Sequence, residues 1–181
     1  VAVGLDQDKV AGVAVTGATG PTIQVTARDA FGNTDTTFKV FVTVALSGGP
    51  ATATLSGTKT VLAAAGVATF ADLKVDSAGS GYTLGASTTS PGVAAAASAA
   101  FAVAPAAATQ LTFSAQPVTT TAGQTIQSVV VTVRDAAGNK VTSFVGNVTL
   151  TLGANPTGGT LGGTLQQPVN NGVATFGDLN I

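Results

Sequence analysis

The sequence contains no cysteine, histidine, methionine or tryptophan, and every acidic residue in it is an aspartate. Without cysteine and histidine the chain cannot build a thiolate or imidazole metal site, a cysteine nucleophile or a Ser-His-Asp triad, because those chemistries require those side chains. Most classes of enzyme are excluded on this ground, and we expect no cofactor.

Charged residues are also scarce. Only 8% of the residues are charged, and the formal net charge is −1. Binding to nucleic acid or to an anionic membrane surface depends on clustered lysine and arginine that neutralise phosphate groups. The sequence therefore predicts no nucleic-acid partner.

Long hydrophobic runs are missing as well. The most apolar segment, residues 92–108, consists mainly of alanine and includes Pro105. It is shorter than the roughly 20 apolar residues that a helix needs to cross a bilayer. We therefore expect no membrane insertion in this part of the chain.

The residues that are abundant favour a folded structural protein. Hydrophobic residues make up 45% of the 181 positions, which is enough for one large core or two small ones. Plentiful threonine, alanine, glycine and valine with few lysines are typical of a surface-exposed protein. The chain begins at Val1 and shows no signal peptide, so we expect a processed product or a piece of a larger protein.

The hexapeptide Arg-Asp-Ala-x-Gly-Asn occurs twice, beginning at Arg28 and at Arg134, which are 106 residues apart. The same offset aligns residues 28–75 with residues 134–181 without a gap, and about 22 of these 48 pairs are identical. Solenoid repeats are only about 20–50 residues long, so a repeat of this length indicates tandem domains.

The repeat also sets the domain boundaries. We expect the first domain over residues 1–106 and the second over residues 107–181, with small residues around Pro105 as a short linker. The second domain then lacks the residues equivalent to 76–106, so we expect its sandwich to be incomplete at the C-terminal end. Three explanations stay open: the natural chain continues, the last strands are disordered, or another subunit donates strands into the gap.

Apolar and polar residues alternate through both domains, which is the signature of half-buried strands. Further strands are expected over residues 66–73, 81–88 and 95–104. About seven short strands in each copy, separated by turn residues, favour an all-β fold with two antiparallel β-sandwiches in series. The inward positions of two strands in the first copy are Ile23, Val25 and Ala27, and Val40, Val42, Val44 and Leu46.

Each hexapeptide follows a predicted strand and precedes the next alternating run. We interpret it as a turn that connects a hairpin, because glycine and asparagine tolerate positive φ and aspartate can accept hydrogen bonds from downstream amides. A carbohydrate or cation contact at the turn is the alternative. The turn residues are Asp29, Gly32 and Asn33 in the first copy and Asp135, Gly138 and Asn139 in the second.

The order of these motifs resembles that of bacterial immunoglobulin-like domains of the invasin and intimin type, group 1. The Asp-x-x-Gly-Asn turn is followed by a Gly-Val-Ala turn at residues 66–68 and by Gly81-Tyr82 at the start of a late strand. The resemblance implies tandem immunoglobulin-like sandwiches in a bacterial protein at the cell surface or outside the cell. It also implies that neighbouring repeats, and other copies in a fibre, are the partners, and it transfers no catalytic residue.

Three aspartates at predicted strand ends are candidate calcium ligands. Asp72 and Asp178 occupy equivalent places in the two copies, and Asp76 follows in the first. Such a residue commonly caps a turn; a calcium ion at a domain junction is the alternative. Asp6 and Asp8 have a spacing that suits one cation, but no further acidic residues follow them, which favours exposed strand-edge positions.

Two aromatic residues have distinct predicted roles. Phe41 falls on the solvent face of its strand, where the second copy has Asn147, and is a candidate for contact with a neighbouring domain or chain. Tyr82, the only tyrosine, is expected to be buried with its hydroxyl bonded to the backbone, as in a tyrosine corner.

These observations predict a non-enzymatic extracellular module that serves as a stalk or forms a fibre. An adhesin is the first alternative, with loops 47–57 and 153–163 binding glycan or protein, because loops on a rigid sandwich often carry function. The second alternative is an accessory domain of a larger secreted enzyme.

Overall fold

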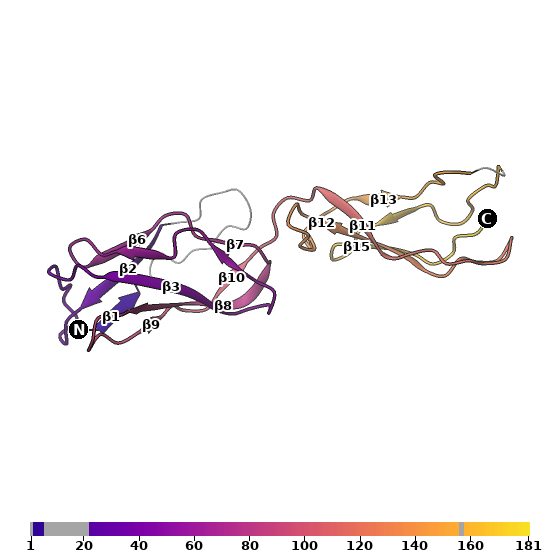
Figure 1. The fold of residues 1–181 in the computed structure, drawn as a ribbon. Coiled ribbons are helices and arrows are strands. Elements are labelled where there is room, and N and C mark those ends of the chain that lie inside the picture. The colour runs from indigo at the N-terminus through magenta and orange to yellow at the C-terminus, as the bar shows by residue number, and fades with distance from the viewer. Residues whose placement is uncertain (1, 6–21, 156–157) are drawn as a thin grey trace. The chain divides into compact units, whose positions relative to one another are not determined.

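The computed structural model describes residues 2–5, 22–155 and 158–181 (Figure 1). The chain divides into two compact units, Val1–Ala104 and Pro105–Ile181, which we call unit 1 and unit 2. Every regular element in the described residues is a β-strand, so none of them is a helix able to cross a membrane. The predicted all-β fold is confirmed.

Unit 1 is a sandwich of two antiparallel sheets. One sheet has the strand order β1-β2-β6, and the other has the order β10-β8-β3-β5, with β9 also paired to β8. The strands β4 and β7 form a small separate pair. The bounds are β1 Ala2–Leu5, β2 Ile23–Arg28, β3 Phe41–Gly48, β4 Leu55–Ser56, β5 Thr60–Leu62, β6 Val67–Phe70, β7 Lys74–Val75, β8 Gly79–Thr88, β9 Ala96–Ala97 and β10 Phe101–Val103.

The core of unit 1 is built from alternate residues of both sheets. Ile23, Val25 and Ala27 of β2 are buried, and Val42 and Val44 of β3 are buried opposite them in the same hydrophobic cluster. This is the face assignment that alternation predicts, because successive side chains of a strand point to opposite faces. Two other residues are predicted to point inward, one just before β3 and one near its C-terminal end. Both are half-buried and pack against the same cluster.

Unit 2 repeats part of this arrangement. Its strands are β11 Gln110–Ala115, β12 Val129–Arg134, β13 Asn147–Thr149, β14 Gln166–Pro168 and β15 Val173–Phe176. One sheet has the order β11-β12-β15, equivalent to β1-β2-β6, and β13 pairs with β14 as β3 pairs with β5. The β13–β14 register matches that of β3 and β5 after the offset of the repeat, since Val148 faces Gln167 as Val42 faces Val61. The register of the first strand is shifted by two residues: Arg134 pairs with Gln110, whereas Arg28 pairs with Ala2.

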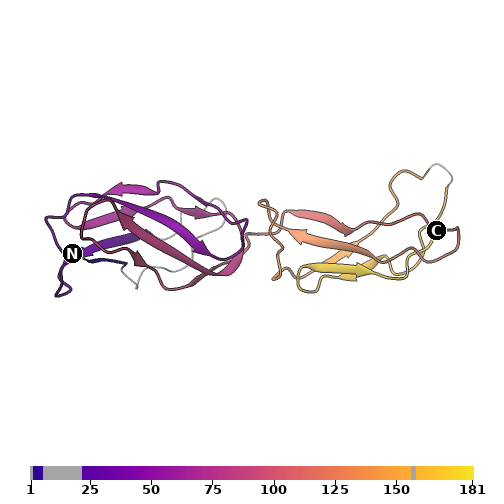
Figure 2. The same ribbon diagram turned by 60° about the horizontal axis from the view of Figure 1, so that its bottom comes forward.

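The two units differ on one side of the second sheet. In unit 1, β3 pairs with β8 along Val42–Gly48, and the two strands lie side by side in both views (Figures 1 and 2). In the described part of unit 2, the equivalent residues 148–154 have a strand neighbour only on the β14 side. The second sandwich therefore has an open side.

Two predictions about connections are wrong. Neither hexapeptide connects a hairpin, since the strands before and after it, β2 and β3 in unit 1 and β12 and β13 in unit 2, belong to different sheets. The predicted strand 95–104 is divided into β9 and β10, because Ser98 turns inward between them. Its hydroxyl accepts a hydrogen bond from the Leu84 amide at 2.9 Å and donates one to the Ala99 carbonyl at 2.7 Å.

Candidate functional site

The hexapeptide of unit 1 is a tight turn organised by one carboxylate. Oδ1 of Asp29 accepts hydrogen bonds from the backbone amides of Phe31 at 2.9 Å and Asn33 at 2.8 Å. The side-chain amide of Asn33 donates to Oδ2 at 3.2 Å. Gly32 has a φ of 85°, a conformation that favours glycine. The Arg28 side chain closes the turn by donating to the Gly32 carbonyl at 2.9 Å.

The hexapeptide of unit 2 has the same hydrogen bonds. Oδ1 of Asp135 accepts from the amides of Ala137 at 3.0 Å and Asn139 at 2.8 Å, and Gly138 also has a φ of 85°. Arg134 donates to the Gly138 carbonyl at 2.6 Å. The repeated motif is thus a repeated turn, in which the aspartate accepts hydrogen bonds from downstream amides and the glycine has a positive φ.

Asp135 has one contact that extends beyond its turn. Its Oδ2 accepts a hydrogen bond from the backbone amide of Ala106 at 3.0 Å, and the residue is fully buried. Burial raises the pKa of this carboxyl, but hydrogen bonds from Asn139, Ala106 and Ala137 outweigh that effect and lower the pKa overall. The buried carboxylate therefore stays charged at neutral pH and holds the first residues of unit 2.

The three calcium candidates each bind a threonine. The carboxylate of Asp72 accepts from the amide of Thr58 at 2.9 Å and from its hydroxyl at 2.8 Å. Asp178 accepts from the amide of Thr164 at 3.0 Å and from its hydroxyl at 2.6 Å. We call these two equivalent contacts the Thr–Asp clamps. Asp76 is held in the same way by the amide and hydroxyl of Thr54, at 2.8 and 2.5 Å.

These hydrogen bonds favour the charged form of each carboxyl. The amide and then the hydroxyl of Thr58 lower the pKa of Asp72, and the hydroxyl and then the amide of Thr164 lower the pKa of Asp178. Within residues 2–5, 22–155 and 158–181, no group of three or more acidic side chains comes together as a set of metal ligands. Asp6 and Asp8 lie outside the described residues.

The Thr–Asp clamps were not identified from the sequence, although a signal was present. In both copies a Gly-Thr pair is followed by the aspartate 14 residues after the threonine. Gly57 and Gly163 have φ values of 98° and 95°, and a Cβ on either would overlap the carbonyl of the clamp aspartate. The repeated Gly-Thr and Asp therefore mark a close approach of two chain segments.

Tyr82 lies where the sequence predicts. The residue is fully buried, and its hydroxyl donates a hydrogen bond to the Ser77 carbonyl at 2.8 Å. Its ring stacks on Phe101, with 5.6 Å between the ring centroids. Burial, and then the charge of Asp76, raises the pKa of this hydroxyl.

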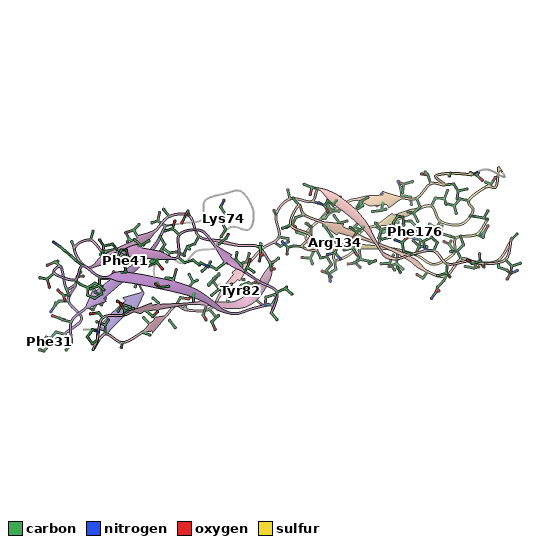
Figure 3. All side chains as sticks on the ribbon, viewed as in Figure 1. Phe31, Phe41, Lys74, Tyr82, Arg134 and Phe176 are labelled. Atoms are coloured by element: carbon green, nitrogen blue, oxygen red, sulfur yellow. The ribbon has the colours of Figure 1, made fainter. Side chains whose placement is uncertain are left out.

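Large apolar side chains are exposed on unit 1. Phe41 is 58% exposed, as predicted for the solvent face of β3, and Leu62, which lies opposite it on β5, is 52% exposed. Phe31 at the tip of the first turn is 90% exposed. Figure 3 shows Phe31 and Phe41 toward the same end of unit 1. Unit 2 has Asn147 and Pro168 at the two paired strand positions.

The open side of unit 2 is a groove between β11 and the chain around β13. It consists of three adjoining hollows with volumes of about 250, 240 and 140 Å³. Leu111 and Phe113 of β11 line the groove and are 59% and 48% exposed. From the opposite side the groove is lined by Val148, Leu150 and Leu152.

No family model matches the chain, and no curated protein matches it. A solved structure described as FdeC, a broadly conserved adhesin of Escherichia coli that elicits protection against urinary tract infections, shares 23% sequence identity with a TM-score of 0.43. The match covers 98% of this chain and 54% of that adhesin, so the chain spans about half the length of the protein it matches.

Proposed function

We propose that the chain is a non-enzymatic extracellular structural module, a stalk or fibre-forming segment of a repetitive bacterial surface protein, built from repeats of the invasin and intimin type. One observation carries this proposal. The last strand of unit 1 ends at Val103, and the Ala106 amide is already bonded to the buried Asp135. Only Ala104 and Pro105 lie between these anchored positions, and proline has a fixed φ.

The way each unit is built supports the same role. Each unit has its own hydrophobic cluster, so neither depends on the other for burial of its core. A module of this kind adds length to a protein simply by being repeated. The aspartates of the turns and clamps accept hydrogen bonds from backbone amides and threonines within their own unit, which is a structural use of a carboxylate.

The proposal assigns the chain a place outside a bacterial cell and partners of its own kind. Adjacent repeats in the same polypeptide would continue the stalk, and other copies would join it in a fibre. The low charge favours this arrangement. Only 8% of the residues are charged, so the electrostatic repulsion between identical modules is weak.

Display on a bacterial surface tests the stalk directly. The chain is inserted between a membrane anchor and a peptide epitope, and antibody binding is measured on cells that carry a thick polysaccharide layer. A glycine-serine segment of equal length is the control, since a random coil reaches only about 5–6 Å times the square root of its residue number. We expect more antibody to bind with the chain than with the coil, and equal binding would contradict the stalk role.

A second candidate function is adhesion, which the exposed apolar side chains of unit 1 favour. Phe41 and Leu62 form an apolar pair on the sheet surface, and Phe31 projects from a turn. A panel of glycans and matrix proteins tests this role with the unmodified chain and with Phe41→Thr. Saturable binding that Phe41→Thr weakens would support adhesion, and binding that the substitution leaves unchanged would contradict this surface as its site.

A further inference from the structure

One asparagine of unit 2 has a neighbour that makes its side chain reactive. Asparagine is a thermally labile residue, because the backbone nitrogen of the following residue can attack the carbon of the side-chain amide. A side chain on the following residue hinders this attack, and glycine has none. Asn171 is the only asparagine in the sequence that precedes glycine; the other six precede threonine, lysine, valine, proline, asparagine or isoleucine.

The fold requires this pair of residues where it stands. Asn171 and Gly172 are the two central residues of a tight turn directly before β15, and both have a positive φ, of 48° and 76°. The turn is closed by the Asn170 amide, which donates to the Val173 carbonyl at 2.8 Å, and by the Val173 amide, which donates back at 3.0 Å. Turns with a positive φ at both central residues favour Asn-Gly. The conformation therefore selects the pair that is also the most reactive.

Both reacting groups are unengaged. Asn171 is exposed. In the part of the chain that the structure describes, neither its side chain nor the Gly172 amide makes a hydrogen bond. The equivalent turn of unit 1 differs on both points, since the Gly66 amide donates to the Phe38 carbonyl at 3.2 Å and Ala65 stands in place of the asparagine. Unit 1 thus has the same turn without the reactive group.

Other asparagines are held by their side chains. The side-chain amide of Asn33 donates to Asp29 at 3.2 Å, and that of Asn155 donates to the Gly159 carbonyl at 2.6 Å. Turning either amide carbon toward the next backbone nitrogen would break these bonds. Their engagement adds to the effect of the following side chain and separates them further from Asn171.

We propose that Asn171 is a site of spontaneous deamidation in the folded chain. The Gly172 nitrogen loses its proton to hydroxide and bonds to Cγ of Asn171. The bond from Cγ to the side-chain nitrogen breaks, and that nitrogen takes a proton from water and leaves as ammonia. The succinimide ring that results is opened by one molecule of water, which reaches it because Asn171 is exposed.

Opening the ring at Cγ gives an ordinary aspartate at position 171. Aspartate tolerates the left-handed conformation as asparagine does, so this product keeps the turn. It lowers the formal net charge of the chain from −1 to −2. The new carboxylate stands beside the Lys140 side chain, whose Cγ would be only 2.9 Å from a Cβ built on Gly172.

Opening the ring at the other carbonyl gives an isoaspartyl residue. The main chain then runs through the side chain of residue 171 and is longer by one carbon atom. A two-residue turn cannot take up this atom and keep both bonds between Asn170 and Val173. The Gly172 carbonyl, which accepts from the Val133 amide of β12 at 2.9 Å, is displaced as well. The isoaspartyl product therefore weakens unit 2 and leaves unit 1 unaffected.

Ageing of the whole 181-residue chain tests the proposal. The folded chain is incubated at mildly alkaline pH and separated by anion exchange, and mass spectrometry of its peptides locates any asparagine converted to the acid. We expect one form shifted by a single negative charge, with the change at position 171, accumulating faster as the pH rises. Asn171→Asp should elute with this form from the start.

Two matched variants identify the residue. Asn171→Ala copies Ala65 of unit 1, so it keeps the turn and should give no acidic form. Asn170→Ala removes the adjacent exposed asparagine and should age like the natural chain. The proposal is overturned if the folded chain stays unchanged while the unfolded chain reacts, if the acid appears first at another asparagine, or if Asn171→Ala ages at the natural rate.

A second readout separates the two products. Isoaspartyl residues are counted by enzymatic methylation of their carboxyl group, with the methyltransferase used as a reagent. We expect the isoaspartyl fraction to unfold at lower urea by circular dichroism, with the midpoint of Tyr82 fluorescence unchanged. An isoaspartyl fraction with the natural urea midpoint would contradict the proposed effect on unit 2.

Discussion

Asp135 is the residue on which the start of unit 2 depends. It is fully buried, whereas the equivalent Asp29 is half-buried and holds only its own turn. Replacing Asp135 with alanine removes the acceptor of the Ala106, Ala137 and Asn139 amides. Since a hydrogen bond to a charged group contributes about 1.5–3 kcal/mol, we expect Asp135→Ala to lower the free energy of unfolding of unit 2 by about 2 kcal/mol or more.

The sequence provides a convenient way to measure this. Tyr82 is the only tyrosine and the chain has no tryptophan, so tyrosine fluorescence reports the unfolding of unit 1 alone. Far-ultraviolet circular dichroism reports both units. In urea, Asp135→Ala should shift the circular dichroism transition but not the fluorescence transition. Asp29→Ala should give the smaller loss, and an equal or larger loss would contradict the role of burial.

The hydroxyl of Tyr82 offers a second test at a single atom. Tyr82→Phe keeps the ring beside Phe101 but leaves the Ser77 carbonyl without its donor. A typical hydrogen bond contributes about 1 kcal/mol, so we expect unit 1 to lose roughly that amount of stability. Urea unfolding followed by circular dichroism checks this prediction, and a variant as stable as the natural chain would show that the bond contributes nothing.

At the scale of strands, the sequence predicts which residues face inward but not how the strands connect. The alternation of Ile23, Val25 and Ala27 identifies the buried face of β2, and the structure confirms it. Alternation is the same whichever sheet a strand joins, so it could not show that β2 and β3 lie in different sheets. The buried Ser98 breaks the pattern between β9 and β10, because its hydroxyl is satisfied by backbone groups that only the fold brings near.

The residues of the candidate sites likewise divide into those that the sequence predicts and those that it does not. The turn aspartates and the buried Tyr82 could be predicted, since their partners lie within a few residues in the sequence. The Thr–Asp clamps could not be predicted from one copy alone, because Thr58 lies between β4 and β5 and Asp72 lies between β6 and β7. The contact of Ala106 with Asp135 joins the linker to a turn 29 residues later, and no local pattern indicates it.

The missing neighbour of β13 gives a prediction at this scale. The backbone amides of Thr43 and Ala45 in β3 point toward β8. The equivalent amides of Thr149 and Thr151 point toward the open groove. We expect the amides of the second pair to exchange with solvent faster by about tenfold or more, because open backbone hydrogen-bonding groups exchange without unfolding. Nuclear magnetic resonance of amide exchange measures each residue separately. Equal protection of the two pairs would show that the groove is already closed.

For the whole molecule, the aspartates set the dependence of stability on pH. The chain has no histidine and no glutamate, and the pKa values of Asp29, Asp72, Asp76, Asp135 and Asp178 are all lowered in the folded state. A lowered pKa stabilises the fold above the unfolded value of 3.8 and ceases to do so as the pH falls through the folded value.

We therefore expect stability to be flat from about pH 5 to pH 7 and to fall below about pH 4. Thermal unfolding across this range measures the effect. Asp72→Asn should make the acid loss smaller, because that side chain no longer takes up a proton. A loss of stability between pH 5 and pH 7 would contradict this explanation, since no aspartate with a lowered pKa titrates there.

The stalk proposal requires that each module folds without help from its neighbour, because only then does repetition add length without changing the parts. The separate clusters of unit 1 and unit 2 support this requirement. The fluorescence of Tyr82 makes the requirement measurable, because it follows unit 1 whatever happens in unit 2.

The most direct measurement is the urea midpoint of Tyr82 fluorescence in three proteins: the natural chain, Asp135→Ala, and residues 1–104 alone. If the modules are independent, the three midpoints coincide, although unit 2 is weakened in the second protein and absent from the third. A midpoint that falls in step with unit 2 would show that the units fold as one, and would contradict the account of the chain as a series of self-sufficient spacers.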